Sequence, residues 1–390
     1  MKKPILVLFS ILFCLLLNAQ EDKAAPVILP AEVSTTAQQV TINGKTIPLT
    51  ANAGTMQLRD ENNEVIALFG FTSYTKNNGA TDRPIVFAYN GGPGSSSFWL
   101  HMGVLGPKRI VVNDPDFTPA SPYPLVNNEY SILDIADLVM IDPVGTGLSV
   151  PTGKAEFKDF WGVDQDIRSI SLFITQYLIE NDRLNSPKFL LGESYGTFRN
   201  AGVMKHLLSQ GIAMNGVIMV SAVFDLRTLL FPPNDDMPYV AHFPTYAATA
   251  WYHKKSQTRH DNLELFLEEV RKFTVEEYVP ALFLGDQISA ERKQEVAQRL
   301  AMYSGLSKEF WLRADLRVKA GEYFQELLRE EGMTVGRLDS RYKGTNEDLL
   351  SQFADYDPQS SAISPAYITT FLDCFHRELG VSKDLMYTIT

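Results

Sequence analysis

The sequence predicts an α/β protein whose mostly parallel sheet is covered by helices on both faces. Short, continuous apolar runs at residues 85–89, 137–141, 188–191 and 217–220 indicate strands that are buried on both faces. Between the second and the third run, apolar residues recur at helical spacing over residues 163–178, which predicts a helix lying on the sheet. Strands that alternate with helices in this way are typical of a parallel sheet.

Antiparallel strands are expected before this alternation begins. Residues 40–42, 55–59 and 65–74 are short runs of strand-forming residues separated by turn signals such as Asn43-Gly44. Residues 20–39 are rich in Pro and Ala and show no clear period, so we expect a flexible lead-in there. The core of the α/β domain is then expected to span residues 40–224.

The alternation stops after residue 224. Pro232-Pro233 interrupts the pattern, and long, charged stretches with helical character follow it. We interpret residues 225–357 as a mainly helical cap that is inserted above the sheet. Residues 358–390 are expected to begin the C-terminal part of the core, with a helix over 367–378.

The first residues resemble an export signal. Two lysines at positions 2 and 3 precede an apolar run over residues 5–17, and Ala19 offers a cleavage site. The run is too short to span a bilayer comfortably, and the charged residues that follow it disfavour a buried hydrophobic helix. We therefore expect a signal peptide over residues 1–19, a periplasmic or secreted protein, and no stable membrane insertion after cleavage.

Composition restricts the possible partners. The net charge of -11 argues against nucleic acid or an anionic membrane as a binding partner. A hydrophobic content of 45% and an aromatic content of 11% are typical of a globular enzyme, and no low-complexity segment is evident.

The strongest chemical signal is the sequence Gly-Glu-Ser-Tyr-Gly at residues 192–196. It follows an apolar strand and precedes a helix-like segment, which is the context that a nucleophile elbow requires. The sharp turn would expose the hydroxyl of Ser194, and the N-terminus of the following helix would favour a developing oxyanion. Ser194 is therefore the candidate nucleophile, and the amide of Tyr195 is a candidate oxyanion donor.

A glycine-rich segment at residues 90–97, Asn-Gly-Gly-Pro-Gly-Ser-Ser-Ser, directly follows another strand. A phosphate-binding loop is one alternative, but the Gly-Lys-Ser/Thr of a nucleotide loop is absent. An oxyanion loop fits better, because hydrolases of this architecture take a second amide from an early strand-to-helix loop. We expect Gly92 to supply that amide.

Four motifs in order carry a resemblance to a known family. They are the glycine-rich segment, Leu-Gly-Pro at residues 105–107, Asp-Pro-Val-Gly-Thr-Gly-Leu-Ser at residues 142–149, and the Gly-Glu-Ser-Tyr-Gly segment. Over residues 85–222, and more loosely to residue 358, the chain resembles the serine carboxypeptidases of the α/β-hydrolase fold. The resemblance implies that peptides are the substrates and that no metal or organic cofactor is needed.

The resemblance also implies a substrate-binding set. In this family the C-terminal carboxylate of the substrate is held by an asparagine of the glycine-rich loop and by the glutamate before the serine. These positions are Asn90 and Glu193, with Gly91 in the same loop. A glutamate beside a bound carboxylate requires a shared proton, because two like charges cannot lie at hydrogen-bonding distance without a large penalty. Binding at acid pH is therefore expected.

One departure from the family bears on the substrate. Family members commonly carry a second glutamate where this chain has Val104, so the expected carboxylate-binding set is incomplete. An esterase or acyltransferase on the same scaffold is therefore an alternative to a carboxypeptidase.

A second departure bears on the catalytic triad, which this fold presents in the order Ser, Asp, His. Residues 357–390 contain no strand followed by Asp and no Gly-His, so we expect the chain to stop before the strands that carry them. A catalytically inactive homologue is therefore a further alternative. The six histidines are interpreted as solvated or packed. Asp142 precedes the serine, so it is expected to brace the loop of Gly145 and Gly147 or to line the pocket.

Overall fold

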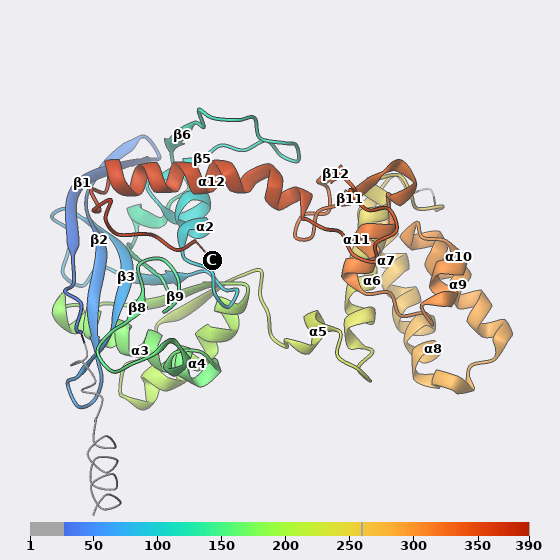
Figure 1. The fold of residues 1–390 in the computed structure, drawn as a ribbon, viewed down its shortest axis with the longest axis horizontal. Coiled ribbons are helices and arrows are strands. Elements are labelled where there is room, and N and C mark those ends of the chain that lie inside the picture. The colour runs from blue at the N-terminus through green and yellow to red at the C-terminus, as the bar shows by residue number, and fades with distance from the viewer. Residues whose placement is uncertain (1–26, 259, 390) are drawn as a thin grey trace, which may run out of the picture.

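The computed structural model describes residues 27–258 and 260–389 (Figure 1). The expected signal peptide at residues 1–19 lies outside the described residues. Among the residues that are described, no helix is both long and apolar enough to cross a membrane.

Eight strands of the described chain form the main sheet. Its spatial order is β1 (Val33–Ile42), β2 (Lys45–Arg59), β3 (Val65–Lys76), β7 (Asp137–Ile141), β4 (Ile85–Tyr89), β9 (Lys188–Glu193) and β10 (Gly216–Val220), and the short β8 (Val150–Pro151) pairs with β3. The first three strands are antiparallel, and β7, β4, β9 and β10 are parallel to one another. The predicted mostly parallel sheet with antiparallel strands on its N-terminal side is confirmed, and β4 and β7 have the predicted bounds.

The expected lead-in at residues 20–39 is wrong in its second half. Residues 33–39 belong to β1, which pairs with β2 along its whole length, from Val33 opposite Gly54 to Ile42 opposite Lys45. Most side chains of β1 remain at least partly exposed, so the strand leaves little apolar pattern in the sequence. Residues 33–39 are held in the sheet mainly by backbone hydrogen bonds to β2, whereas Val40 and Ile42 at the end of the strand are buried in the core.

Helices cover both faces of the sheet, as predicted. On one face, α3 (Val163–Glu180) and α4 (Tyr195–Ser209) pack against Phe87 and Tyr89 of β4. On the other face, the C-terminal half of α12 (Pro358–Arg377) and the short α2 (Phe98–Leu100) pack against Val86 and Ala88 of the same strand. The alternation along β4 therefore divides the core into two layers.

The strand over residues 217–220 is less buried than its apolar sequence predicts. In β10, Ile218 is 41% exposed and Met219 is 39% exposed. The reason is that β10 is the edge strand of the described sheet, with β9 as its one strand neighbour there.

A separate helical region, residues 237–345, has its own core. It contains α6 (Met237–Tyr252), α7 (Leu263–Phe273), α8 (Val279–Leu284), α9 (Ala290–Ser304), α10 (Lys308–Arg313), α11 (Ala320–Glu326) and the hairpin of β11 (Met333–Val335) and β12 (Lys343–Thr345), and it follows the short α5 (Arg227–Leu230). Phe243, Tyr278, Trp311 and Tyr323 are fully buried in it. The prediction of a mainly helical segment is confirmed.

The expected position of this region as a cap above the sheet stays a prediction. Figure 1 shows it to one side of the sheet, connected through α5 and the N-terminal end of α12. The helix α12 is longer than predicted and contacts both β11 and β12 and, further along, α2 and β5 (Lys108–Ile110), which pairs with β6 (Leu125–Asn127). The helix α12 therefore connects the helical region to the core. In addition, Arg341 of the helical region forms an ion pair with Asp114 of the core.

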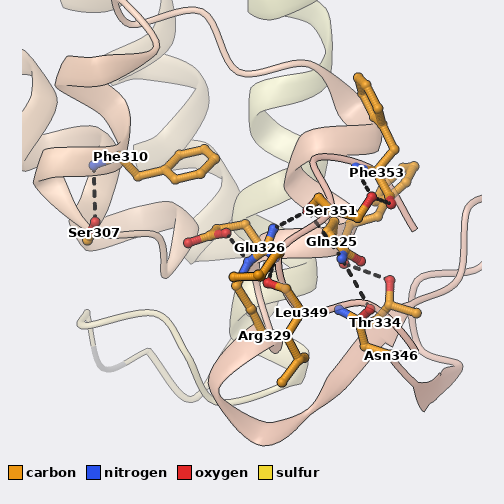
Figure 2. A network of polar contacts seen from close by, with 12 residues as sticks. Ser307, Phe310, Gln325, Glu326, Arg329, Thr334, Asn346, Leu349, Ser351 and Phe353 are labelled. Atoms are coloured by element: carbon orange, nitrogen blue, oxygen red, sulfur yellow. Dashed lines mark hydrogen bonds and ion pairs between the residues drawn. The ribbon is translucent and has the colours of Figure 1, made fainter. Parts of the chain in front are cut away.

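A polar network fixes the loop after β12 to α11 (Figure 2). The amide of Gln325 donates to Asn346 Oδ1 over 3.1 Å and to the carbonyl of Asp348 over 2.9 Å. Nearby, Arg329 donates to the carbonyl of Ser351 over 2.9 Å. These bonds satisfy loop carbonyls, which keeps a segment without regular structure in one conformation.

Candidate active site

The backbone at Ser194 has the strained conformation of a nucleophile elbow. Strand β9 ends at Glu193, α4 begins at Tyr195, and Ser194 between them has φ 54° and ψ -124°. A positive φ at a residue with a side chain costs on the order of 1–3 kcal/mol, so the surrounding structure has to enforce it. A Cβ atom on Gly192 would collide with the carbonyl of Gly196, which explains why glycine flanks the serine. The predicted strand–turn–helix context is confirmed.

The elbow is tied to the end of β10. The amide of Ser194 donates to the carbonyl of Val220 over 2.9 Å. The hydroxyl of Thr197 donates to the carbonyl of Ser194 over 2.7 Å and accepts from the amide of Val223 over 2.8 Å. These three bonds supply the constraint that the strained serine needs.

The glycine-rich loop lies directly against this elbow. The side-chain amide of Asn90 donates to Glu193 Oε2 over 3.0 Å, and the amide of Gly91 lies 3.4 Å from the same oxygen. A Cβ atom on Gly91 would lie 2.5 Å from the amide nitrogen of Tyr195, so only glycine permits this approach. The structure therefore brings together Asn90, Gly91, Glu193 and Tyr195 around Ser194. The role of the Gly92 amide as an oxyanion donor stays a prediction.

Asp142 braces the loops of the site, as its position before the serine indicated. Its Oδ1 atom accepts hydrogen bonds from the amide and the hydroxyl of Ser97 over 2.8 and 2.7 Å, and Tyr387 donates a further one to the carboxylate. A Cβ atom on Gly147 would collide with this carboxylate. Burial raises the pKa of Asp142 to about 6, and the hydrogen bonds from Ser97 partly offset that rise.

The segment around Tyr387 also lies on these loops. Thr388 and Gly147 exchange two backbone hydrogen bonds of 2.7 and 2.9 Å. The carbonyl of Ile389 accepts from the amide and the hydroxyl of Ser96 over 3.2 and 2.8 Å. Sequence reasoning assigned no role to these residues, because nothing in a run of polar and aromatic residues indicates a partner far away in the chain.

The histidines have partners elsewhere. His101 is buried, bonds to the hydroxyl of Tyr74 over 2.7 Å, and has its pKa lowered to about 4 by burial, so it is neutral at neutral pH. The other five bond as follows: His206 to Gln210, His242 to the carbonyl of Pro238, His253 to the carbonyl of Ser340, His260 to Glu269, and His376 to the carbonyl of Val381. Within the described part of the chain, no histidine is hydrogen-bonded to Ser194.

Two further observations concern the ligand that the site would accept. No group of three or more His, Cys, Asp or Glu side chains suited to a metal ion occurs among the described residues. Val104 occupies the position where serine carboxypeptidases commonly carry a second glutamate. It is 46% exposed and lies in the short π-helix His101–Leu105.

Sequence reasoning missed Arg199 and Asp166. Arg199 is buried beneath the elbow, forms an ion pair with Asp166 over 2.7 Å, and donates to the carbonyl of Asn90 over 2.9 Å. The available signal was an arginine four residues after Tyr195, which places it on the same face of α4. A single arginine in a helix is usually solvated, so this signal is weak without the fold.

Ser194 has a strained backbone between a parallel strand and a helix, and it lies beside a glycine-rich loop from the neighbouring strand. This arrangement is that of the α/β-hydrolase fold. Residues 43–229 match the family model described as serine carboxypeptidase. Over these residues, which make up slightly less than half of the chain, the protein is similar to the serine carboxypeptidase family.

Two relatives illustrate the extent of the match. The chain is 31% identical to the pheromone-processing carboxypeptidase KEX1 of Saccharomyces cerevisiae over 189 residues, which are 46% of this chain and 24% of that protein. It is 28% identical to serine carboxypeptidase-like 49 of Arabidopsis thaliana over 216 residues, 55% of this chain and 38% of that one. The match thus covers well under half the length of these relatives.

A solved structure is similar over a longer stretch. The crystal structure of a prohormone-processing carboxypeptidase from Saccharomyces cerevisiae aligns with 92% of this chain and 70% of its own chain, at 18% identity and a TM-score of 0.48.

Proposed function

We propose that this protein is a serine-type carboxypeptidase that releases C-terminal residues from peptides. The observation that carries the proposal is the cluster of Asn90, Gly91 and Glu193 next to Ser194. An amide side chain and a backbone amide converge there on one carboxylate oxygen, beside a serine in the elbow conformation. Donors of this kind, placed next to a nucleophile, suit a substrate whose reacting bond lies close to a free carboxylate.

In the proposed reaction, the oxygen of Ser194 attacks the carbonyl carbon of the last peptide bond. The amides of Tyr195 and Gly92 would stabilise the negative charge on the tetrahedral intermediate, and the N-terminus of α4 adds a favourable dipole. The intermediate expels the C-terminal amino acid, and water then hydrolyses the acyl-enzyme. The serine proton has to pass to a general base, a role that no histidine of the described residues fills through a hydrogen bond.

The carboxylate of the substrate would bind to Asn90 and Gly91. The carboxylate of Glu193 already contacts these two donors, so it would lie next to the bound carboxylate of the substrate. One proton has to be shared between the two carboxylates. Binding should therefore be favoured at acid pH. Export to the periplasm or out of the cell, proposed from residues 1–19, would give access to extracellular peptides.

An esterase or acyltransferase is the second candidate, and the exposed Val104 favours it, because no acidic side chain at that position completes the carboxylate site. The test compares one N-acylated dipeptide with its C-terminal amide as substrates of the full-length protein. We expect cleavage of the free acid to be faster by a factor of ~10 or more, the equivalent of one charge-assisted hydrogen bond. Equal rates would support the esterase, and no turnover of either compound would support an inactive homologue.

A further inference from the structure

We propose that Arg199 is a positioning residue that sets the preference of the site for a free carboxylate. In this assignment its guanidinium holds the carboxylate-binding Asn90 and the elbow residue Tyr195 in one fixed arrangement. The inference rests on the proposed function, because it assumes that Asn90 and Glu193 receive the carboxylate of the substrate.

The contacts of Arg199 reach both parts of the site. Its side chain is 1% exposed, and its Nη1 atom donates to the carbonyl of Asn90 over 2.9 Å. The guanidinium carbon lies 5.2 Å from the ring centre of Tyr195 and 5.0 Å from that of Tyr89. One buried cation therefore contacts the glycine-rich loop and the first residue of α4 at once.

Asp166 fixes the direction of this guanidinium. Its Oδ2 atom lies 2.7 Å from Nε of Arg199, and its side chain is 13% exposed. The hydroxyl of Tyr195 also hydrogen-bonds to Asp166. Because a buried arginine requires a partner for its charge, the pair occupies one geometry rather than several. The first turn of α3 is thereby connected to the nucleophile elbow.

Asn90 is held on three sides, and Arg199 supplies one of them. The side-chain oxygen of Asn90 accepts from the amide of Leu100 over 3.1 Å, and its side-chain nitrogen donates to Glu193 over 3.0 Å. The third contact is the main-chain bond from Arg199 to the Asn90 carbonyl. Without it a buried carbonyl loses its partner, and the peptide unit that carries the side chain is free to rotate. Carboxylate binding should suffer more than the affinity for the rest of the peptide.

The competing explanation is that Arg199 only stabilises the fold. A matched control exists at the opposite edge of the sheet, where Arg183 bonds to Asp137, the first residue of β7, over 2.8 Å. These two side chains are 11% and 4% exposed, so the pair is buried to a similar degree. It lies at the amino ends of the parallel strands and has no contact with Asn90 or Tyr195 among its hydrogen bonds.

The experiment measures binding, so that it does not depend on turnover. In the full-length protein carrying Ser194→Ala, the affinities for an N-acylated dipeptide and for its C-terminal amide are compared by titration calorimetry. Arg199→Met should lower the affinity for the free acid by a factor of ~10 or more, while the affinity for the amide changes little. Arg199→Lys retains the charge but lacks the planar fork, so it should restore only part of the preference.

Arg183→Met serves as the control and should lower the melting temperature without altering the ratio of the two affinities. An unchanged ratio in Arg199→Met, or an equal change in Arg183→Met, would overturn the inference. Should Arg199→Met fail to fold, Arg199→Lys and Asp166→Asn provide the same comparison. Suppose that the Ser194→Ala protein shows a carboxylate preference that depends on Arg199, while the protein with Ser194 intact shows no turnover. That result would refute the proposed reaction and support the role of Arg199. No preference before any change at Arg199 would refute the inference itself.

Discussion

At the carboxyl edge of the main sheet the backbone is crowded, whereas the helical region of residues 237–345 is filled by large side chains. At the sheet edge, Ser194 has a strained φ of 54°, and Gly91 lies so close to Tyr195 that no Cβ atom fits. In the helical region, Tyr246 stacks on Tyr323 with ring centres 4.2 Å apart. At the sheet edge, close contacts between single atoms thus determine which residues fit. In the helical region, the total apolar volume of the side chains determines it.

This contrast separates two kinds of failure. Substitutions at the sheet edge should impair chemistry or binding while most of the fold persists. Substitutions in the helical region should lower the free energy of unfolding and leave the site intact. The reason is that the core of the helical region is a hydrophobic cluster separate from the core of the sheet. The following experiments test that separation, beginning with the largest expected effect.

Replacing Ser194 with alanine should reduce kcat by a factor on the order of 10⁴–10⁶, because the nucleophile itself is removed. The melting temperature should stay the same or rise, since alanine retains the turn and no side-chain hydrogen bond of Ser194 is lost from the described structure. Steady-state hydrolysis and thermal unfolding are measured on the same preparations. Ser209→Ala, at the other end of α4, is the control and should hydrolyse normally.

Phe243→Ala should destabilise the protein by about 3–5 kcal/mol, because it leaves a cavity in the aromatic core of the helical region. Phe243 is 0% exposed, whereas Phe283 in the same region is 87% exposed, so Phe283→Ala is the matched control. Chemical denaturation gives the free energy of unfolding of each. Loss of kcat in Phe243→Ala at temperatures where it is fully folded would contradict the separation of the two regions.

Gly91→Ala should lower kcat/KM roughly 10- to 100-fold, since relieving the contact with Tyr195 costs about 1–3 kcal/mol of displacement. Gly94→Ala is a matched control, because a Cβ atom there meets no neighbour within 4 Å although φ is +104°. Both proteins are assayed with one peptide substrate. Because φ is positive at Gly94 but not at Gly91, Gly94→Ala reports the effect of backbone strain alone. Equal losses in the two variants would contradict a special requirement for the close approach of Gly91 to Tyr195.

Asp142→Asn should change the dependence of stability on pH, which is the smallest of the four effects. The pKa of Asp142 is raised from 3.8 to about 6, mainly by burial, so the folded state favours the protonated form. This contribution is present at pH values below the unfolded pKa of 3.8 and is lost as pH rises through about 6. The stability of the original protein should therefore fall relative to Asp142→Asn across that interval. Melting curves of both proteins against pH measure the difference, and parallel curves would contradict it.

Local sequence was sufficient for the elements whose signal is local. The apolar run of β4 and the Gly-Glu-Ser-Tyr-Gly turn can each be recognised from a few consecutive residues, and both were predicted correctly. By contrast, β1 and α12 both begin earlier in the structure than predicted. Most side chains of β1 are at least partly exposed, and the N-terminal half of α12 contains Pro358 and Pro365, so neither segment has a clear local signal. In the structure Pro358 occupies the first turn, where a missing amide costs nothing.

The part of the site that escaped prediction depends on distant pairs. Asp166 and Arg199 are 33 residues apart and meet because α3 and α4 lie side by side on the sheet. Likewise, Tyr387 reaches Asp142 from the far end of the chain. Charge and polarity in the sequence do not specify such pairs, because the same side chains are stable when they face solvent.

The most direct test of the account is whether Ser194 is an activated nucleophile. The full-length protein is treated with an organophosphorus ester that phosphonylates activated serines, and the modified residue is located by peptide mass spectrometry. The account predicts one adduct, on Ser194, that is absent from Ser194→Ala. An unmodified Ser194 under conditions that label a control serine hydrolase would contradict it, as would an adduct on a different serine.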